Sequence, residues 1–144
     1  MAIAARNDPY GALNFFIEID GITVAGFSEC SGLSTETDVI EYREGGEPTL
    51  MRKMPGLTRY APIVLKRGIT KNRDLWKWRK TVMDGKVSRR SVSIILLDEE
   101  RKEVARWNVV NAWPSKWEGP HLNAKTSEVA IETLELVHEG FDFE

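Results

Sequence analysis

Alternating apolar and polar residues near the start of the chain predict a β-hairpin. In LNFFIEI (13–19) the odd-numbered residues are all apolar, and two of the three even-numbered residues are polar. A period of two residues is typical of a strand that buries one face. The pair Asp20-Gly21 suits a tight turn, and ITVAGF (22–27) then resumes the extended pattern. We therefore expect two paired strands here.

The same pattern predicts further short strands along the chain. We expect them over residues 36–42, 49–54, 61–66, 91–97 and 103–110, with turns at 28–32 and 98–101. The segment SEVAIETLELVHEGF (127–141) fits a helix almost as well as a strand. It is expected to be a strand because of its β-branched residues, Val129, Ile131, Thr133 and Val137.

One segment, over about residues 73–84, is predicted to be helical, because Leu75, Trp78 and Val82 recur at helical spacing. Asn72 suits the N-cap, and Gly85 is a natural stop because glycine readily adopts the left-handed conformation. Many short strands with one helix predict a mainly β protein, a small barrel or sandwich. The 144 residues are expected to form one domain, 1–144.

A segment of mixed chemistry, EYREGGEPTLMRKMPG (41–56), falls among the predicted strands. Strand-like stretches flank its Gly45-Gly46 pair, so a second hairpin is expected there instead of a disordered insertion. A phosphate-binding loop needs a further glycine followed by lysine, but Met51 and Arg52 stand at those positions. The segment is therefore interpreted as an arm and not as a ligand cradle.

The net charge of −2 hides an uneven distribution. Ten lysine or arginine residues and two acids lie between Lys66 and Arg90, whereas Glu128–Glu144 holds six acids and no lysine or arginine. This division fits a nucleic-acid face with an acidic tail, two solvated faces, or a basic part that meets the acidic part of a neighbouring subunit. The sequence has no run of about 20 apolar residues and no signal-peptide pattern at its start, so cytosolic synthesis without membrane insertion is expected.

Candidate chemistry is sparse. One cysteine and two histidines supply neither a disulfide framework nor a zinc cluster. GFSEC (26–30) departs from the nucleophile-elbow pattern at Cys30, which is interpreted as a buried small residue. LWKWRK (75–80) mixes indoles and cations as single-strand binders do, but Trp78 falls on the apolar helix stripe. We expect no catalytic residues, no metal, no cofactor and no enzyme activity.

Eight blocks together resemble the tail tube proteins of contractile phages and of phage-tail-like contractile injection systems. In chain order they are FSECSGL (27–33), YREGG (42–46), MPGLTRY (54–60), LKRGIT (65–70), LLDEE (96–100), NAWPSKWEGP (111–120), LNA (122–124) and EVAIETLELVHEG (128–140). The resemblance implies two packed antiparallel sheets forming a barrel-like body, with one flanking helix. It also implies hexameric rings that stack into a hollow tube inside a contractile sheath.

The resemblance further implies partners for such a tube. These are other copies of the chain, the sheath protein, tube-initiator and baseplate proteins, and cargo or DNA in the lumen. The particle is expected to assemble in the cytoplasm and then to be released or membrane-anchored, and contraction is expected to drive the tube through a target envelope.

The arm, approximately residues 42–59, is the expected contact between stacked rings. Its apolar residues would bury against a neighbour while its charged residues set the register; the alternative is a hairpin folded back on its own subunit. The expected interface comprises Tyr42, Arg43, Glu44, Glu47, Leu50, Met51, Arg52, Lys53, Met54, Leu57 and Arg59.

Two other functions compete with a bulk tube protein. One is a tube-initiator or adaptor ring of the same machine, which is less favoured because the chain ends soon after HEG (138–140). The other, of a different class, is a monomeric nucleic-acid-binding β-barrel.

Overall fold

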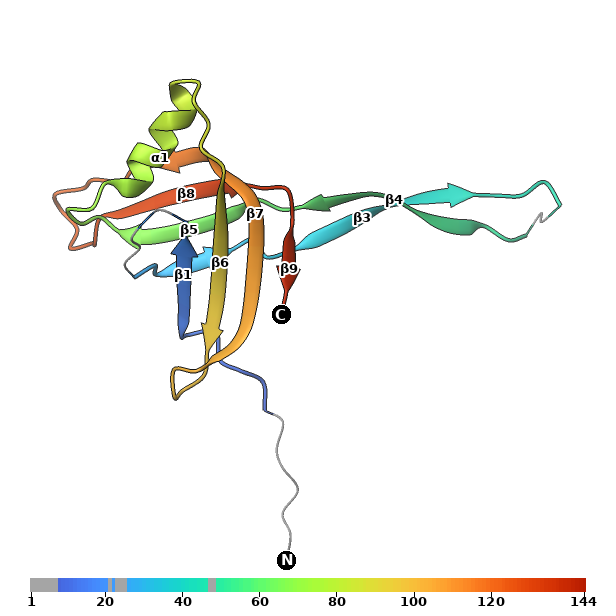
Figure 1. Ribbon diagram of the computed structural model, residues 1–144, viewed down its shortest axis with the longest axis horizontal. Helices are drawn as coiled ribbons and strands as arrows, with labels where there is room; N and C mark the ends of the chain where they lie inside the picture. Colours follow the sequence, from blue (N-terminus) through green and yellow to red (C-terminus); the bar gives the residue numbers. More distant parts are fainter. Residues whose placement is uncertain (1–7, 21, 23–25, 47–48) are drawn as a thin grey trace, which may run out of the picture.

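The computed structural model describes residues 8–20, 22, 26–46 and 49–144. Nine strands and one helix are formed by these residues (Figure 1). Their bounds are β1 Phe15–Ile19, β2 Glu29–Ser31, β3 Thr35–Tyr42, β4 Arg52–Tyr60, β5 Ile63–Gly68, α1 Asp74–Met83, β6 Arg90–Leu97, β7 Glu103–Glu118, β8 Ile131–Val137 and β9 Phe141–Phe143.

Seven of the strands form one antiparallel sheet that is bent along β7. The order is β1-β6-β7-β8-β5-β2, and β9 also pairs with β7. The first part of β7 pairs with β6 and β9, whereas its second part, from Trp113 onward, pairs with β8. Asn111 has a positive φ of 50° at this change of partner, and the β6–β7 register shifts nearby. The strand therefore turns from one half of the sheet into the other.

The expectation of a barrel-like body made of two packed sheets needs correction. The body is one continuous sheet whose two halves share β7, and it does not close, because the end strands β1 and β2 do not pair in the described structure. These end strands have only five and three residues, respectively. The body is mainly β with antiparallel strands and one helix, as predicted.

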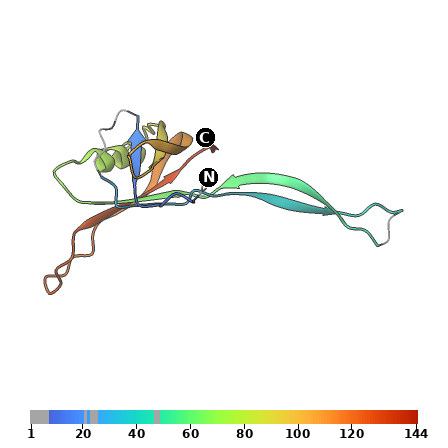
Figure 2. The same ribbon diagram turned by 90° about the horizontal axis from the view of Figure 1, so that it is seen from below.

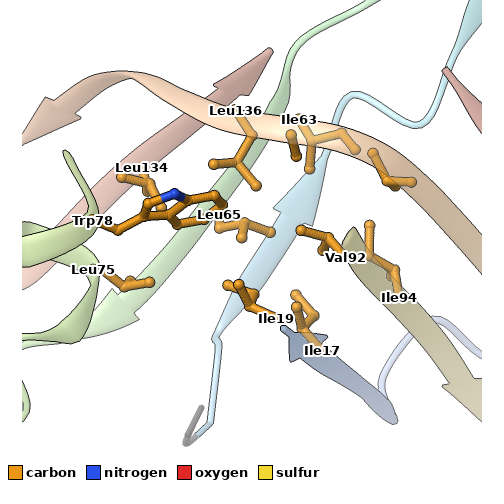
Figure 3. Packing of buried hydrophobic residues seen from close by; sticks show 12 residues of the cluster. Ile17, Ile19, Ile63, Leu65, Leu75, Trp78, Val92, Ile94, Leu134 and Leu136 are labelled. Atoms are coloured by element: carbon orange, nitrogen blue, oxygen red, sulfur yellow. The ribbon is translucent and has the colours of Figure 1, made fainter. Parts of the chain in front are cut away.

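The hydrophobic core fills the space between the two halves and under the helix. Ile17, Val92 and Ile94 come from the first half, and Leu65 and Leu134 from the second (Figure 3). Burial of each such side chain stabilises the fold by about 1.5–3 kcal/mol.

The helix ends as predicted but begins one residue later than the expected cap implies. Arg73 occupies the N-cap, yet the Asn72 side chain accepts a hydrogen bond from the Asp74 backbone N–H at 2.8 Å. Gly85 has φ 77°, and the backbone N–H groups of residues 85 and 86 donate to carbonyls of the last turn, which is the usual glycine stop. Within the described residues, no helix combines the length and apolar character needed to cross a membrane.

Several strand predictions were incomplete. The segment 28–32 is not a turn: its centre forms β2, which pairs with β5. The strand β7 continues eight residues beyond the predicted end at Val110, and β4 runs to Tyr60 instead of ending at Met54. Both extensions contain a proline, Pro114 or Pro55, at a place where the strand has only one neighbour. A missing N–H is tolerated at such an edge.

Other predicted elements agree with the structure or lie outside it. The segment 127–141 contains β8, so the preference for a strand was confirmed, and the turn at 98–101 is present. In the predicted hairpin 13–27, β1 forms and Ile22 makes an isolated bridge with Ile19. The hairpin's turn residue Gly21 and residues 23–25 lie outside the described residues.

Burial of Cys30 is expected to lower the reactivity of its thiol, which can be measured. The thiol is half-buried on β2, and this desolvation raises its pKa to about 11 from 9.0. Since the thiolate is the reactive form, at pH 8 we expect thiol labelling of the folded protein to be about 100-fold slower than in denaturant. The stabilisation from the neutral thiol is present below about pH 9 and is lost as the pH rises toward 11. Equal labelling rates in the two states would contradict this placement.

Candidate assembly interface

The β3–β4 hairpin, residues 35–60, is an arm that extends away from the body (Figures 1 and 2). Within the described structure, its two strands pair with each other and with no other strand. Every residue of the two strands is exposed except Asp38 and Gly56, which are half-buried. The arm therefore offers nearly all of its surface to other molecules.

A β-bulge divides the arm into two parts. The register shifts after Thr37, so that one residue on β3 faces two on β4 before Val39 pairs with Pro55. Gly56 lies here against β3, and a Cβ added to it would come within 3.1 Å of the Asp38 carbonyl oxygen. A bulge also increases the local twist of a ribbon.

The part next to the body, the stem (35–38 and 56–60), is mainly polar, and several of its polar side chains bond to one another. The hydroxyl oxygens of Thr37 and Thr58 lie 3.0 Å apart across the strands, and the Thr35 hydroxyl donates to the Arg59 carbonyl oxygen. The Arg59 guanidinium forms an ion pair with Asp38 at 2.8 Å. Arg59, expected at an interface between subunits, is thus engaged within its own arm.

The outer part, the distal half (39–42 and 52–55), is richer in apolar side chains. Val39 pairs with Pro55, and Ile40 pairs with Met54. Ile40 and Met54 are 51% and 50% exposed, and Val39 is 63% exposed. Apolar side chains grouped on a surface in this way are typical of an interaction site.

The root of the arm is packed on the body through aromatic rings. Tyr60 lies 5.1 Å from Phe141 and 5.7 Å from His138, measured between ring centroids. The Gly140 backbone N–H donates to Nδ1 of His138, so Nε2 carries the proton and donates to the Ala61 carbonyl oxygen. These contacts hold the direction in which the arm leaves the body.

The structure places most of the predicted interface residues on the arm's exposed surface. Tyr42, Arg52, Lys53 and Met54 lie on the paired strands of the distal half, and Leu57 lies at the bulge. Exposed positions at or near the tip are held by Arg43, Glu44, Leu50 and Met51. Glu47 lies outside the described residues.

Sequence reasoning missed Val39 and Ile40 as interface candidates. Both lie in the strand predicted over 36–42 and are followed by Glu41. Two consecutive apolar residues in a strand place one on each face. That pair is the signal in the sequence that points to both residues.

A second open surface is the outer face of β2, β5, β8 and β7. One row across the strands contains Glu29, Lys66, Thr133 and Glu118. Lys66 contacts Glu29 at 3.6 Å, and Lys116 contacts Glu118 at 2.7 Å. The hydrogen bond from Lys116 lowers the pKa of Glu118. Charges of both signs therefore offset one another on this face.

The two tryptophan side chains of the helix make contacts within the subunit. Trp78 is buried, as predicted, and its Nε1 donates to the Ser88 carbonyl oxygen at 2.6 Å. Trp76 packs edge-on against Trp117 with centroids 4.9 Å apart. Base stacking needs an open indole face, and these contacts weaken that interpretation.

The uneven charge is partly balanced inside the subunit. Arg67, from the basic segment, lies directly opposite Glu132, from the acidic one, across β5 and β8. Their side chains are buried and form an ion pair at 2.6 Å. These two charges are therefore paired inside the subunit.

The sequence matches the family model described as T4-like virus tail tube protein gp19 over residues 11–142. The chain belongs to this family. It is a structural tube protein, as the eight sequence blocks predicted. The comparison with curated protein sequences finds no match.

Solved structures of tail tube relatives agree with this assignment. A chain from the PVC sheath–tube complex, an extracellular contractile injection system in the extended state, is 25% identical with a TM-score of 0.86, and the match covers 94% of this chain and 91% of that one. A chain from the cap of the anti-feeding prophage is 26% identical with a TM-score of 0.89, covering 99% and 95%. Hcp1 from Flavobacterium johnsoniae, 14% identical with a TM-score of 0.57 and coverage of 90% and 93%, shares the fold.

Proposed function

We propose that this chain is the repeating subunit of the inner tube of a contractile injection apparatus or phage tail. The whole chain acts as one tail-tube domain. Six copies close into a ring, and rings stack into a hollow tube. The observation that carries the proposal is the arm, which projects from the body with apolar side chains exposed.

Ring closure and stacking require two different surfaces that complement each other on every subunit. The arm supplies one of them, with the residues predicted from sequence, Tyr42 to Arg59, as its contact region. The strand edges of the arm are exposed in the single subunit, and an assembly that covers them protects them from pairing with other strands.

The partners proposed for the tube are taken from the assemblies in which its relatives were observed. The PVC relative was observed in a sheath–tube complex and an anti-feeding prophage relative, 26% identical, in a baseplate. We assign this chain the same kinds of partner: a sheath outside the tube and a baseplate at its end. The particle assembles in the cytoplasm before it acts on a target envelope.

The charge-balanced face of β2, β5, β8 and β7 is assigned to the channel. Its lysines are offset by Glu29 and Glu118, so a passing polyanion meets no continuous basic track. Such a surface lets cargo or DNA move without strong retention, because nucleic-acid binding depends on unbalanced positive charge.

Electron microscopy of the purified chain tests the function. We expect negative staining to show rings and long tubes, and mass photometry at low concentration to show species of six subunits. An adaptor ring would give single rings that never lengthen. A monomer that shifts on a single-stranded oligonucleotide would instead support the nucleic-acid-binding alternative and contradict the tube.

A further inference from the structure

The connection between β8 and β9, residues 138–140, ties the root of the arm to the body through one histidine. The ring of His138 lies 5.7 Å from that of Tyr60, at the end of β4, and 6.1 Å from that of Phe141, at the start of β9, between centroids. Its Nε2 is 3.0 Å from the carbonyl oxygen of Ala61, which links the arm to β5. One side chain therefore contacts the arm, its link to the body and the last strand.

The two ring nitrogens of His138 have fixed and opposite roles. A backbone N–H can only donate, so Nδ1, which lies 3.1 Å from the Gly140 nitrogen, accepts a hydrogen bond there. A carbonyl oxygen can only accept, so Nε2 donates to Ala61. Imidazole fills both roles only in its neutral form, because both nitrogens of the imidazolium carry protons. The observed geometry therefore requires a neutral His138.

A proton on Nδ1 of His138 would set two donors against each other and displace Gly140. This glycine is closely packed: its φ is 131°, and a Cβ added to it would come within 3.2 Å of the Tyr60 ring. Its carbonyl oxygen also accepts a hydrogen bond from the Val110 backbone N–H of β7 at 2.9 Å. Displacement of Gly140 would therefore loosen the packing on the arm's root and the contact with β7 together.

The acidic side chains nearest to His138 in sequence do not offset a charge on its ring. The Glu139 carboxylate accepts a hydrogen bond from the Asn111 amide at 2.6 Å. Asp142 follows the residue of β9 whose ring packs near His138, so its side chain points to the opposite face of that strand. Within the part of the chain that the structure describes, no carboxylate forms an ion pair with His138.

The arm likewise supplies no compensating charge. The arm residue that faces the ring is Tyr60, whose phenol is of a kind that is neutral in the pH range where histidine titrates. The neighbouring cation, Arg59, is paired with Asp38 on the stem at 2.8 Å. A proton taken up by His138 therefore costs a hydrogen bond and is not offset by a new ion pair.

We propose that His138 is a pH-sensitive latch at the root of the arm. The neutral ring holds the arm's root against the body at neutral and higher pH. The hold is lost as the pH falls through the range in which imidazole takes up a proton, about pH 6.5. The latch is a property of the single subunit, so it goes beyond the proposed tube function and does not depend on it.

Hydrogen–deuterium exchange of the full chain, isolated as single subunits, tests the latch. Rates are compared at about pH 7.5 and about pH 5.5, on either side of the histidine range, after correction for the intrinsic pH dependence of amide exchange. Loss of one hydrogen bond corresponds to about a fivefold change, so peptides covering 57–63 and 137–143 are expected to exchange about fivefold faster at the lower pH. Equal corrected rates would overturn the latch.

The second histidine of the chain, His121, provides a matched control, because it is exposed in the β7–β8 connection. His138→Asn keeps an acceptor for the Gly140 N–H at every pH, since an asparagine side chain bonds to the backbone two residues further on. We expect His121→Asn to retain the wild-type pH response and His138→Asn to lose it. A response that persists in His138→Asn, or disappears in His121→Asn, would assign the titration to another group and overturn the latch.

Mobility of the arm gives a second measurement that leaves His138 unchanged. A dye insensitive to pH is attached to Met54→Cys on the arm or, as a control, to Lys80→Cys on the helix, while the half-buried Cys30 reacts slowly. We expect the fluorescence anisotropy of the arm dye to fall at the lower pH and that of the helix dye to stay constant. An unchanged arm dye, or an equal fall for both dyes, would show that acid does not act at the root of the arm.

Discussion

Replacing Met51 and Met54 together with aspartate is expected to yield a folded, soluble subunit that forms no tubes. Both methionines are about half exposed on the arm and outside the core, so the fold does not depend on them. In an assembly each buried methionine contributes about 1.5 kcal/mol or more, so losing both raises the concentration needed for assembly about 100-fold. Desolvation of the new carboxylates adds to this loss.

Negative staining and pelleting measure this result, and circular dichroism with size-exclusion chromatography measures the fold. The matched control is Met51→Leu with Met54→Leu, which keeps the apolar area at the same positions and should retain tubes. Long tubes of normal appearance from the aspartate variant would show that the arm is not an assembly contact.

The second large effect is expected in the core, where Glu132→Gln should lower the free energy of unfolding by about 3–5 kcal/mol. The change removes the negative charge that offsets Arg67, whose side chain is only 3% exposed. Trp117 also donates to the second oxygen of this carboxylate, and the Arg67 guanidinium lies 5.8 Å from the centre of the Phe27 ring. A buried cation would be left without its partner.

Chemical denaturation measures the change as a lower midpoint with an unchanged slope, equivalent to a fall in Tm of about 10 °C or more. The control is the double variant Arg67→Met with Glu132→Leu, which removes both charges and should recover most of the stability. A loss below about 1 kcal/mol from Glu132→Gln alone would mean that water compensates Arg67.

Local sequence patterns correctly predicted the elements that depend on residues close together in the chain. The helix stop at Gly85 depends on one glycine, and β8 depends on its β-branched residues and alternating burial. The arm was located by the strand patterns around Gly45-Gly46, although its length was underestimated. The predicted strand ended at Met54, whereas β4 continues through Pro55, and the sequence does not reveal that the strand has only one neighbour there.

Most of the candidate interface could also be predicted from the sequence, because methionine and leucine residues that stand among charged residues can be recognised from a short segment. The division of the arm was not visible, since it depends on the register between β3 and β4. That register brings Ile40 opposite Met54 and Asp38 close to Arg59. It decides which side chains face outward and which are satisfied within the arm.

The sequence by itself determined the mainly β class, the single helix, the presence of an arm and, through ordered blocks across the chain, the tail tube family. Only the tertiary structure decided that the sheet stays open, that β7 bends at Asn111 to serve both halves, and that Arg67 meets Glu132 inside the subunit. The physical reason is the separation along the sequence over which each effect acts. Periodicity and turn chemistry act over a few residues, whereas strand pairing joins residues as distant as Phe15 and Leu96, and the buried ion pair joins residues 65 positions apart.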